Sequence, residues 1–247
     1  MEFPLSFFAF PLNLILLILW VCLVVHWRKK VKLSSWVTLS AIIIFLVIAL
    51  VVGFTGNRDI LKSWPVVLFL LYFQTVLLLV VLRGWSTRRW RFVLNHLGLL
   101  IALVAAYWGA PDEQVLRVQA VREEAVTEVF TMGGNKKQFP YEIMLKDFVL
   151  HTDENGAPSM YQADLLIDQM PVTLKVNHPY QRNFAETLYL SSYDHKGEDE
   201  IRYCVIQIVK QPWRYLILLG IIMMIAGAFL LFIKGPVRRK ESKQVED

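Results

Sequence analysis

Five long apolar runs, separated by short polar segments, are the main feature of the chain. They cover residues 7–26, 37–54, 66–82, 92–108 and 213–233. A helix needs about 20 mostly apolar residues to cross the hydrocarbon core of a bilayer, and each run comes close to that length. The pattern therefore predicts five transmembrane helices, four within residues 1–108 and a fifth at residues 213–233.

The pattern changes between residues 109 and 212 to short runs typical of β-strands. The last of these runs is apolar on much of both faces, which predicts a strand inside a sheet and not at its edge. Turn residues lie between the runs, at Gly133–Gly134, at residues 153–156 and at Lys196–Gly197. The runs expected as strands cover residues 115–121, 125–132, 141–150, 161–167, 172–176, 187–191 and 201–209.

These elements predict an α-helical integral membrane protein with one extracytoplasmic all-β domain, a sandwich or an open barrel, inserted before the last helix. The β domain would occupy residues 109–212. Composition agrees with a membrane protein, since 55% of residues are hydrophobic, 19% are charged and the mean hydropathy is +0.44.

The charge distribution predicts an orientation. Bases gather at residues 28–32, 83–91 and 234–243, whereas residues 109–212 carry ten bases against sixteen acids. Lys and Arg mark cytoplasmic loops. We therefore expect the N-terminus outside, the β domain on the extracytoplasmic side, and residues 234–247 as a basic tail in the cytoplasm. The net charge of +5 then reflects topology and does not indicate a nucleic-acid partner.

The chain offers little for enzyme chemistry. Cys22 lies in the first apolar run and Cys204 in the predicted β domain, so they are not expected to pair, and no Cys-x-x-Cys motif occurs. His151, His178 and His195 lie in expected loops without metal-ligand spacing, and we interpret them as solvated. The acidic run at residues 194–200 is one weak candidate for a cation site, and a solvated turn is the simpler interpretation.

His96 lies inside an apolar run, about five residues into the segment 92–108, whereas His26 is at the boundary of the run 7–26. A polar residue at that depth is costly and calls for a partner or a function. Haem iron takes histidine as an axial ligand, and Arg88, Arg89 and Arg91 could meet haem propionates. A small-residue surface nearby would suit a flat ligand; it consists of Gly98, Ala102 and Ala105. The simpler alternative is a histidine bonded to a neighbouring helix, with the arginines only fixing topology. Met223 and Met224 are interpreted as apolar filler.

The stretch from about Phe92 to Phe232 resembles the ResB or CcsB family of system II cytochrome c biogenesis. The resemblance is carried by residues 95–99 (Asn-His-Leu-Gly-Leu), 176–179 (Val-Asn-His-Pro), 188–193 (Leu-Tyr-Leu-Ser-Ser-Tyr) and 210–213 (Lys-Gln-Pro-Trp). In that family the intramembrane histidine before the domain is regarded as a haem ligand, and His96 is the matching position. We take His96 as the candidate iron ligand and Arg89 and Asn95 as further candidate haem-binding residues.

The resemblance implies a non-catalytic or accessory subunit of a haem lyase complex in the bacterial cytoplasmic membrane. With a CcsA or ResC partner it would carry haem b, as a transient substrate, outward for attachment to apocytochrome c. Two other hypotheses remain. One is a non-haem scaffold whose β domain binds a partner protein. The other is a transporter or channel subunit, although the apolar runs offer few polar groups and no inverted repeat.

Overall fold

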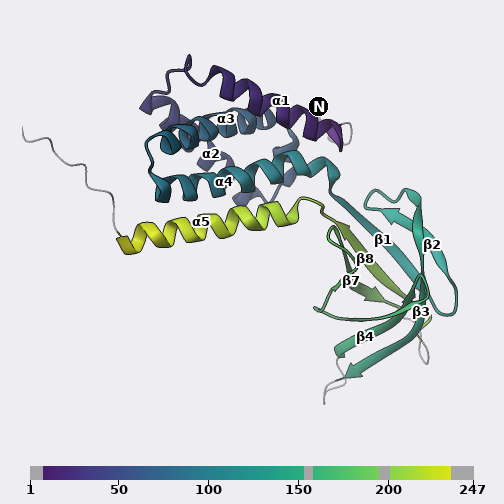
Figure 1. Ribbon diagram of the computed structural model, residues 1–247. Coiled ribbons are helices and arrows are strands. Elements are labelled where there is room, and N and C mark those ends of the chain that lie inside the picture. The colour runs from purple at the N-terminus through teal and green to yellow at the C-terminus, as the bar shows by residue number, and fades with distance from the viewer. Residues whose placement is uncertain (1–7, 153–157, 195–200, 235–247) are drawn as a thin grey trace, which may run out of the picture. The chain divides into compact units, whose positions relative to one another are not determined.

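The computed structural model describes residues 8–152, 158–194 and 201–234 of the chain. It divides into two compact units, a helical unit of residues 1–111 and 213–247 and a β domain of residues 112–212 (Figure 1). The basic tail, the turns expected at residues 153–156 and 196–197, and His195 with most of the acidic run lie outside the described residues.

Five α-helices make up the described part of the helical unit. They are α1 (Leu12–Trp27), α2 (Ser35–Thr55), α3 (Trp64–Ser86), α4 (Trp90–Gly109) and α5 (Arg214–Lys234), with short 3-10 helices η2 (Arg58–Lys62) and η3 (Ala110–Asp112). Four of them, α2 to α5, are long and apolar enough to cross a membrane. The fifth, α1, has 16 residues, or about 24 Å at 1.5 Å per residue, against a hydrocarbon core of about 30 Å. Its crossing stays a prediction.

Local signals explain where α2 begins and ends. The Ser34 hydroxyl accepts a hydrogen bond from the backbone N–H of Val37, which is the arrangement of an N-cap. Gly56 ends the helix with a φ of +63°, a left-handed conformation that glycine adopts without strain, and its N–H donates to the Val52 carbonyl oxygen.

Hydrogen bonds between helix ends show that α1 runs opposite to α4 and that α2 runs opposite to α3. Asn13, at the start of α1, donates to the carbonyl oxygen of Trp108 at the end of α4, over 2.9 Å. At the other end of the group, Arg83 of α3 donates to the carbonyl oxygens of Leu33 and Val31, over 3.1 and 3.2 Å. The basic segments 28–32 and 83–91 therefore lie at one end of the helical unit.

Buried polar side chains within the helical unit have partners. Gln74, 1% exposed, accepts a hydrogen bond from Trp108 Nε1 at 3.2 Å, and Trp20 Nε1 donates to Thr75 Oγ1 at 3.0 Å. Because an unsatisfied polar group in an apolar environment costs several kcal/mol, these pairs favour one packing of α1, α3 and α4 over others.

Glycines bring α4 and α5 into backbone contact. A Cβ added to Gly98 would lie 2.6 Å from the Gly220 carbonyl oxygen, and a Cβ on Gly227 would lie 2.7 Å from the Asn95 backbone nitrogen. At the end of α4, a Cβ on Gly109 would meet the Trp213 ring at 2.5 Å. Small residues allow this close approach, which is how helices associate in membranes without a hydrophobic driving force.

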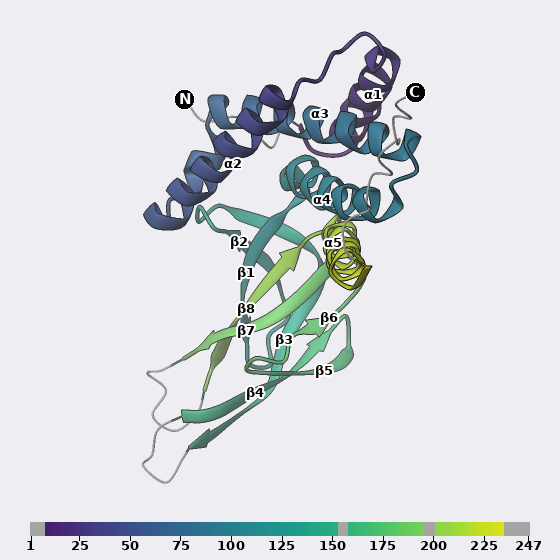
Figure 2. The same cartoon turned by 90° about the vertical axis from the view of Figure 1, so that its left-hand side faces the viewer.

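The β domain is a single antiparallel sheet of eight strands in the order β5-β4-β3-β2-β1-β8-β7-β6 (Figure 2). The strands are β1 (Gln114–Val121), β2 (Val126–Thr131), β3 (Lys136–Thr152), β4 (Pro158–Ile167), β5 (Met170–Lys175), β6 (Tyr180–Gln181), β7 (Glu186–Tyr193) and β8 (Tyr203–Lys210). The outer strands β5 and β6 contact each other, so the sheet curls on itself and matches the open-barrel alternative better than a sandwich of two sheets.

The strand next to the last helix is internal, as predicted from its apolar faces. Throughout its length β8 pairs with β1, from Gln114 opposite Lys210 to Val121 opposite Tyr203, and its other edge pairs with β7. The seven expected runs all form strands. The short β6 was not predicted, because two residues carry no readable alternation.

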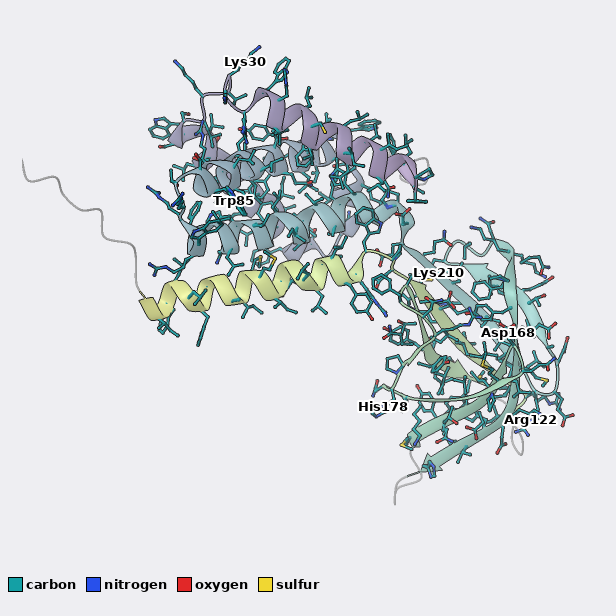
Figure 3. All side chains as sticks on the ribbon, viewed as in Figure 1. Lys30, Trp85, Arg122, Asp168, His178 and Lys210 are labelled. Carbon is teal, nitrogen blue, oxygen red and sulfur yellow. The ribbon has the colours of Figure 1, made fainter. Side chains whose placement is uncertain are left out.

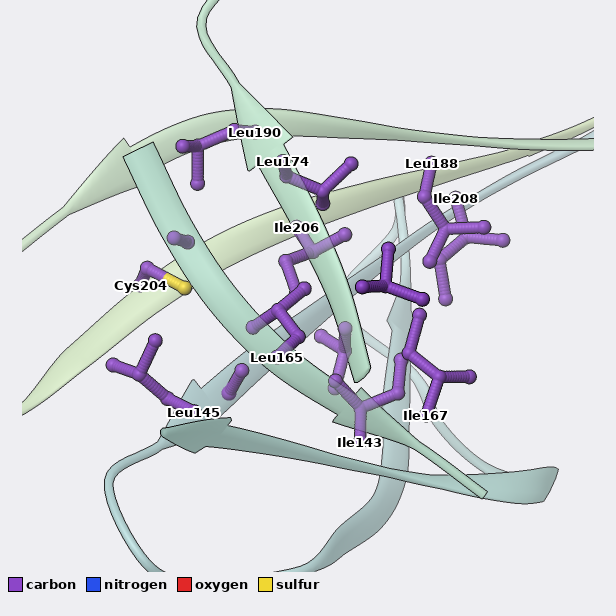
Figure 4. Close-up of a cluster of buried hydrophobic side chains, with 14 of the residues drawn as sticks. Ile143, Leu145, Leu165, Ile167, Leu174, Leu188, Leu190, Cys204, Ile206 and Ile208 are labelled. Atoms are coloured by element: carbon purple, nitrogen blue, oxygen red, sulfur yellow. The ribbon is translucent and has the colours of Figure 1, made fainter. Parts of the chain in front are cut away.

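Alternating side chains build the core of the domain. Leu116, Val118 and Ala120 of β1 face inward with Cys204, Ile206 and Ile208 of β8, each at most 4% exposed. Figure 4 shows several of these chains interleaved with those of β3, β4, β5 and β7. Burial raises the pKa of the Cys204 thiol to about 12, so it remains protonated at neutral pH.

One carboxylate is buried at the end of the sheet where the chain leaves β8. Glu186 is 5% exposed and accepts a hydrogen bond from the hydroxyl of Tyr141. Lys210 Nζ lies 3.6 Å from Glu186 Oε2, and Arg182 Nη1 lies 3.9 Å from Oε1. The Arg182 guanidinium also stacks 3.6 Å from the centre of the Tyr141 ring and pairs with Asp168 at 2.9 Å. The two cations offset the cost of burying the Glu186 charge.

Candidate functional site

A cavity of about 630 Å³ lies among α2, α3 and α4, at the end of the helical unit that carries the basic segments. Small-molecule sites of about 300–1,000 Å³ are usually lined by apolar side chains with a few polar groups. This lining fits that description. It consists of Leu33, Ser34, Ser35, Thr38, Ala41, Ile42, Phe73, Val76, Leu77, Val80, Arg83, Gly84, Thr87, Arg89, Phe92, His96 and Leu99.

His96 is a wall residue of this cavity, on the second turn of α4. Its Nδ1 lies 2.9 Å from the carbonyl oxygen of Phe92, one helical turn earlier. The Phe92 ring stacks on the imidazole with 3.8 Å between centroids and 27° between planes. The hydrogen bond and the stacked ring together fix the orientation of the imidazole.

The same hydrogen bond assigns the tautomer of a neutral His96. A carbonyl oxygen only accepts, so Nδ1 must carry the proton that it donates. The lone pair is then on Nε2, on the side of the ring away from its own backbone. Metal-binding histidines commonly have this arrangement, with one nitrogen bonded to a carbonyl and the other left for the metal.

Two arginines line the same cavity. Arg89, predicted from sequence, lies just before α4 and is exposed. It precedes Phe92 by three residues and lines the same cavity as Phe92 and His96. The sequence placed Arg83 only within a basic cluster. Its guanidinium donates hydrogen bonds to the carbonyl oxygens of Leu33 and Val31, and so holds the segment before Ser34 at the edge of the cavity. Together they put positive charge at the mouth of a mostly apolar cavity.

Asn95 lies apart from this cavity. Its Nδ2 donates to the carbonyl oxygen of Met224 on α5 at 3.5 Å, and its backbone packs against Gly227. Helical geometry explains the separation, because adjacent residues point about 100° apart around the axis. The expected small-residue surface is likewise used by α5, since Gly98 and Ala102 contact Gly220. It serves helix packing and does not open onto the cavity.

The other candidates from sequence lie elsewhere. Arg91 borders a separate apolar groove with Trp85 and Trp90, while Met223 packs close to Gly98. His151 and His178 are exposed in the β domain, the latter labelled in Figure 3. Within residues 8–152, 158–194 and 201–234, no group of three or more His, Cys, Asp or Glu side chains could hold a metal ion.

A protein-family model identifies the chain. The model of the ResB-like family matches residues 82–205, half of the sequence, from the end of α3 to the start of β8. The chain belongs to the ResB-like family. The ResB match spans His96, the whole of α4 and most of the β domain, and it places the chain among the proteins of cytochrome c biogenesis.

Solved structures also include proteins similar to this ResB-like chain. The protein described as "Cytochrome c Heme Lyase CcmF" is similar over 78% of this chain and 34% of its own, with a TM-score of 0.43 and 14% sequence identity. The ResB-like chain thus spans about a third of that protein's length. No curated protein matches the sequence.

Proposed function

We propose that this ResB-like chain binds haem b, as a transient substrate, in the cavity among α2, α3 and α4, with His96 as the iron ligand. The observation that carries the proposal is the hydrogen bond from His96 Nδ1 to the Phe92 carbonyl, which leaves the Nε2 lone pair for a metal at the wall of a mostly apolar cavity. The apolar lining would take the macrocycle, and Arg89 would pair with a propionate at the mouth.

In this proposal the chain is an accessory subunit of a system II complex in the bacterial cytoplasmic membrane. The basic segments at the cavity end would face the cytoplasm, so the cavity would receive haem from that side. The β domain would lie on the extracytoplasmic side, where a CcsA or ResC partner would attach the haem to apocytochrome c. The residues of this chain would hold and orient the haem, and the covalent step would belong to the partner.

The test is the absorption spectrum of the purified protein, expressed with and without its proposed partner. A Soret band that is lost in His96→Ala supports the proposal. His26→Ala is the matched control, because His26 is an exposed histidine at the same end of the helical unit and does not line the cavity. An equal Soret band in wild type and His96→Ala would overturn the role of His96. No band in any preparation would favour the non-haem scaffold.

A further inference from the structure

One end of the β sheet is tied to both connections with the helices. Gln114 opens β1, directly after α4 and η3, and it pairs with Lys210, which ends β8 just before α5. Lys210 in turn pairs with Glu186, the first residue of β7. Three strand ends therefore lie at one level. We call the residues at or next to this level the helix-side rim, namely residues 113–114, 132–135, 183–185 and 211.

Two loops of the rim carry exposed apolar side chains. Met132 and Phe184 are each 62% exposed, and with Met170 they are the most exposed large apolar side chains of the described β domain. Thr131 pairs with Leu116, so Met132 comes level with Val115 at the start of β1. The backbone N–H of Gln211 donates to the Ala185 carbonyl oxygen at 2.7 Å, which ties the Phe184 loop to the chain leaving the domain.

Chain length limits how far this rim can lie from a bilayer. From Gln211 to Arg214, where α5 begins, the chain extends at most about 11 Å at about 3.5 Å per residue. The headgroup layer adds about 6 Å on each side of the hydrocarbon core. Both connections lead into helices long and apolar enough to cross a membrane. If these helices cross a bilayer, the short connections tether the ends of β1 and β8 near its headgroup layer.

We propose that Met132 and Phe184 insert into the lipid interface and seat the β domain on the membrane surface. Aromatic and other apolar side chains gain free energy at the boundary of headgroups and acyl chains. Lys137, exposed beside the Met132 hairpin, would meet lipid phosphates there. This role is separate from haem binding and needs neither His96 nor a partner subunit.

Nitroxide labels on the full chain in phosphatidylcholine and phosphatidylglycerol vesicles test the proposal. The background is Cys22→Ala, and Cys204 stays unlabelled because its thiol is buried and protonated. Single variants Met132→Cys and Phe184→Cys report the rim. Leu150→Cys, an exposed apolar position at the far end of β3, is the water-side control. Phe229→Cys, 63% exposed in the second half of α5, is the lipid-side control.

Each label is scored by its collisions with oxygen, which concentrates in lipid, and with a water-soluble nickel chelate. We expect oxygen to dominate at positions 132, 184 and 229 and the nickel chelate at position 150. Dominance of the nickel chelate at 132 and 184, with position 229 still in lipid, would overturn the proposal. So would protection from both reagents at 132 and 184, which indicates protein contact instead of lipid.

Discussion

Gly98 of α4 and Gly220 of α5 face each other so closely that a Cβ on Gly98 would lie 2.6 Å from the Gly220 carbonyl oxygen. That oxygen belongs to the backbone of a helix, so it cannot rotate away as the end of a flexible side chain would. The helix that carries His96 is therefore held against α5 on one side and borders the cavity on the other.

We predict that Gly98→Ala destabilises the protein by about 1–3 kcal/mol, because α4 and α5 must separate to admit the methyl group. Gly53→Ala in α2 is the control, since a Cβ there meets nothing within 4 Å and alanine favours a helix. Thermal unfolding in detergent, followed by circular dichroism, measures both. Equal midpoints for the two variants would contradict the packing described here.

A second prediction separates arginines of the cavity from arginines that only set orientation. Arg89→Ala should lower the copurified haem by about two- to fivefold, the expected loss of an exposed ion pair. Arg91→Ala should leave it unchanged, because Arg91 borders the groove with Trp85 and not the cavity. The haem content per protein, measured as the pyridine haemochrome, decides between them. The same yield for both variants would remove Arg89 from the site.

The buried carboxylate gives a third prediction. Glu186→Ala should cost about 1–3 kcal/mol of unfolding free energy, since it leaves the Tyr141 hydroxyl, Arg182 and Lys210 without their shared acceptor. Both cations are about a third exposed, which limits the loss. Glu128→Ala, which removes an exposed pair with Lys136, should cost less than about 0.5 kcal/mol. Urea unfolding of the two variants measures the difference.

Alkaline pH should weaken the same cluster. Burial, and then the hydrogen bond to Glu186, raise the pKa of Tyr141 above its usual value near 10. The folded state then keeps a proton that the unfolded state loses, so this contribution is complete below pH 10 and declines as pH rises above 10. We expect the urea midpoint of wild type to fall more between pH 9 and 11 than that of Tyr141→Phe. If the urea midpoints of the two proteins fall equally with pH, the pKa of Tyr141 is the same in the folded and the unfolded state.

The raised pKa of Cys204 predicts slow thiol chemistry. In a Cys22→Ala background, a water-soluble maleimide at pH 8 should leave the folded protein unlabelled, because Cys204 is 0% exposed and its pKa is about 12. Denaturation in urea should expose the thiol and give one label per chain, measured by mass spectrometry. Rapid labelling without urea would show that β8 opens readily.

The sequence was informative where a signal is local. An apolar run with one histidine is visible without a structure, so His96 could be singled out. Short runs typical of strands, separated by turn residues, marked every strand of six residues or more. The role of Arg83 could not be predicted, because its acceptors at Leu33 and Val31 lie about fifty residues away.

Grouping Asn95 with His96 followed their adjacency in sequence. In a helix adjacent residues face different neighbours, and here one side of α4 borders the cavity and the other meets α5. Tertiary packing determines which side of α4 meets which helix. The close approach of α5 at Gly220 and Gly227 places Asn95 on the side that meets α5. The family match covers both residues and does not distinguish their roles.

The full-length pairing of β1 with β8 has an evolutionary consequence. The first and last strands of the β domain are neighbours, with Gln114 opposite Lys210, so the domain begins and ends at almost the same point. A domain of this kind can enter, leave or be exchanged within a helical hairpin without lengthening the link between α4 and α5. Related chains can then keep one helical hairpin while the size of the insert drifts, and a chimaera that replaces residues 112–212 with a short turn should still preserve the α4 and α5 pair.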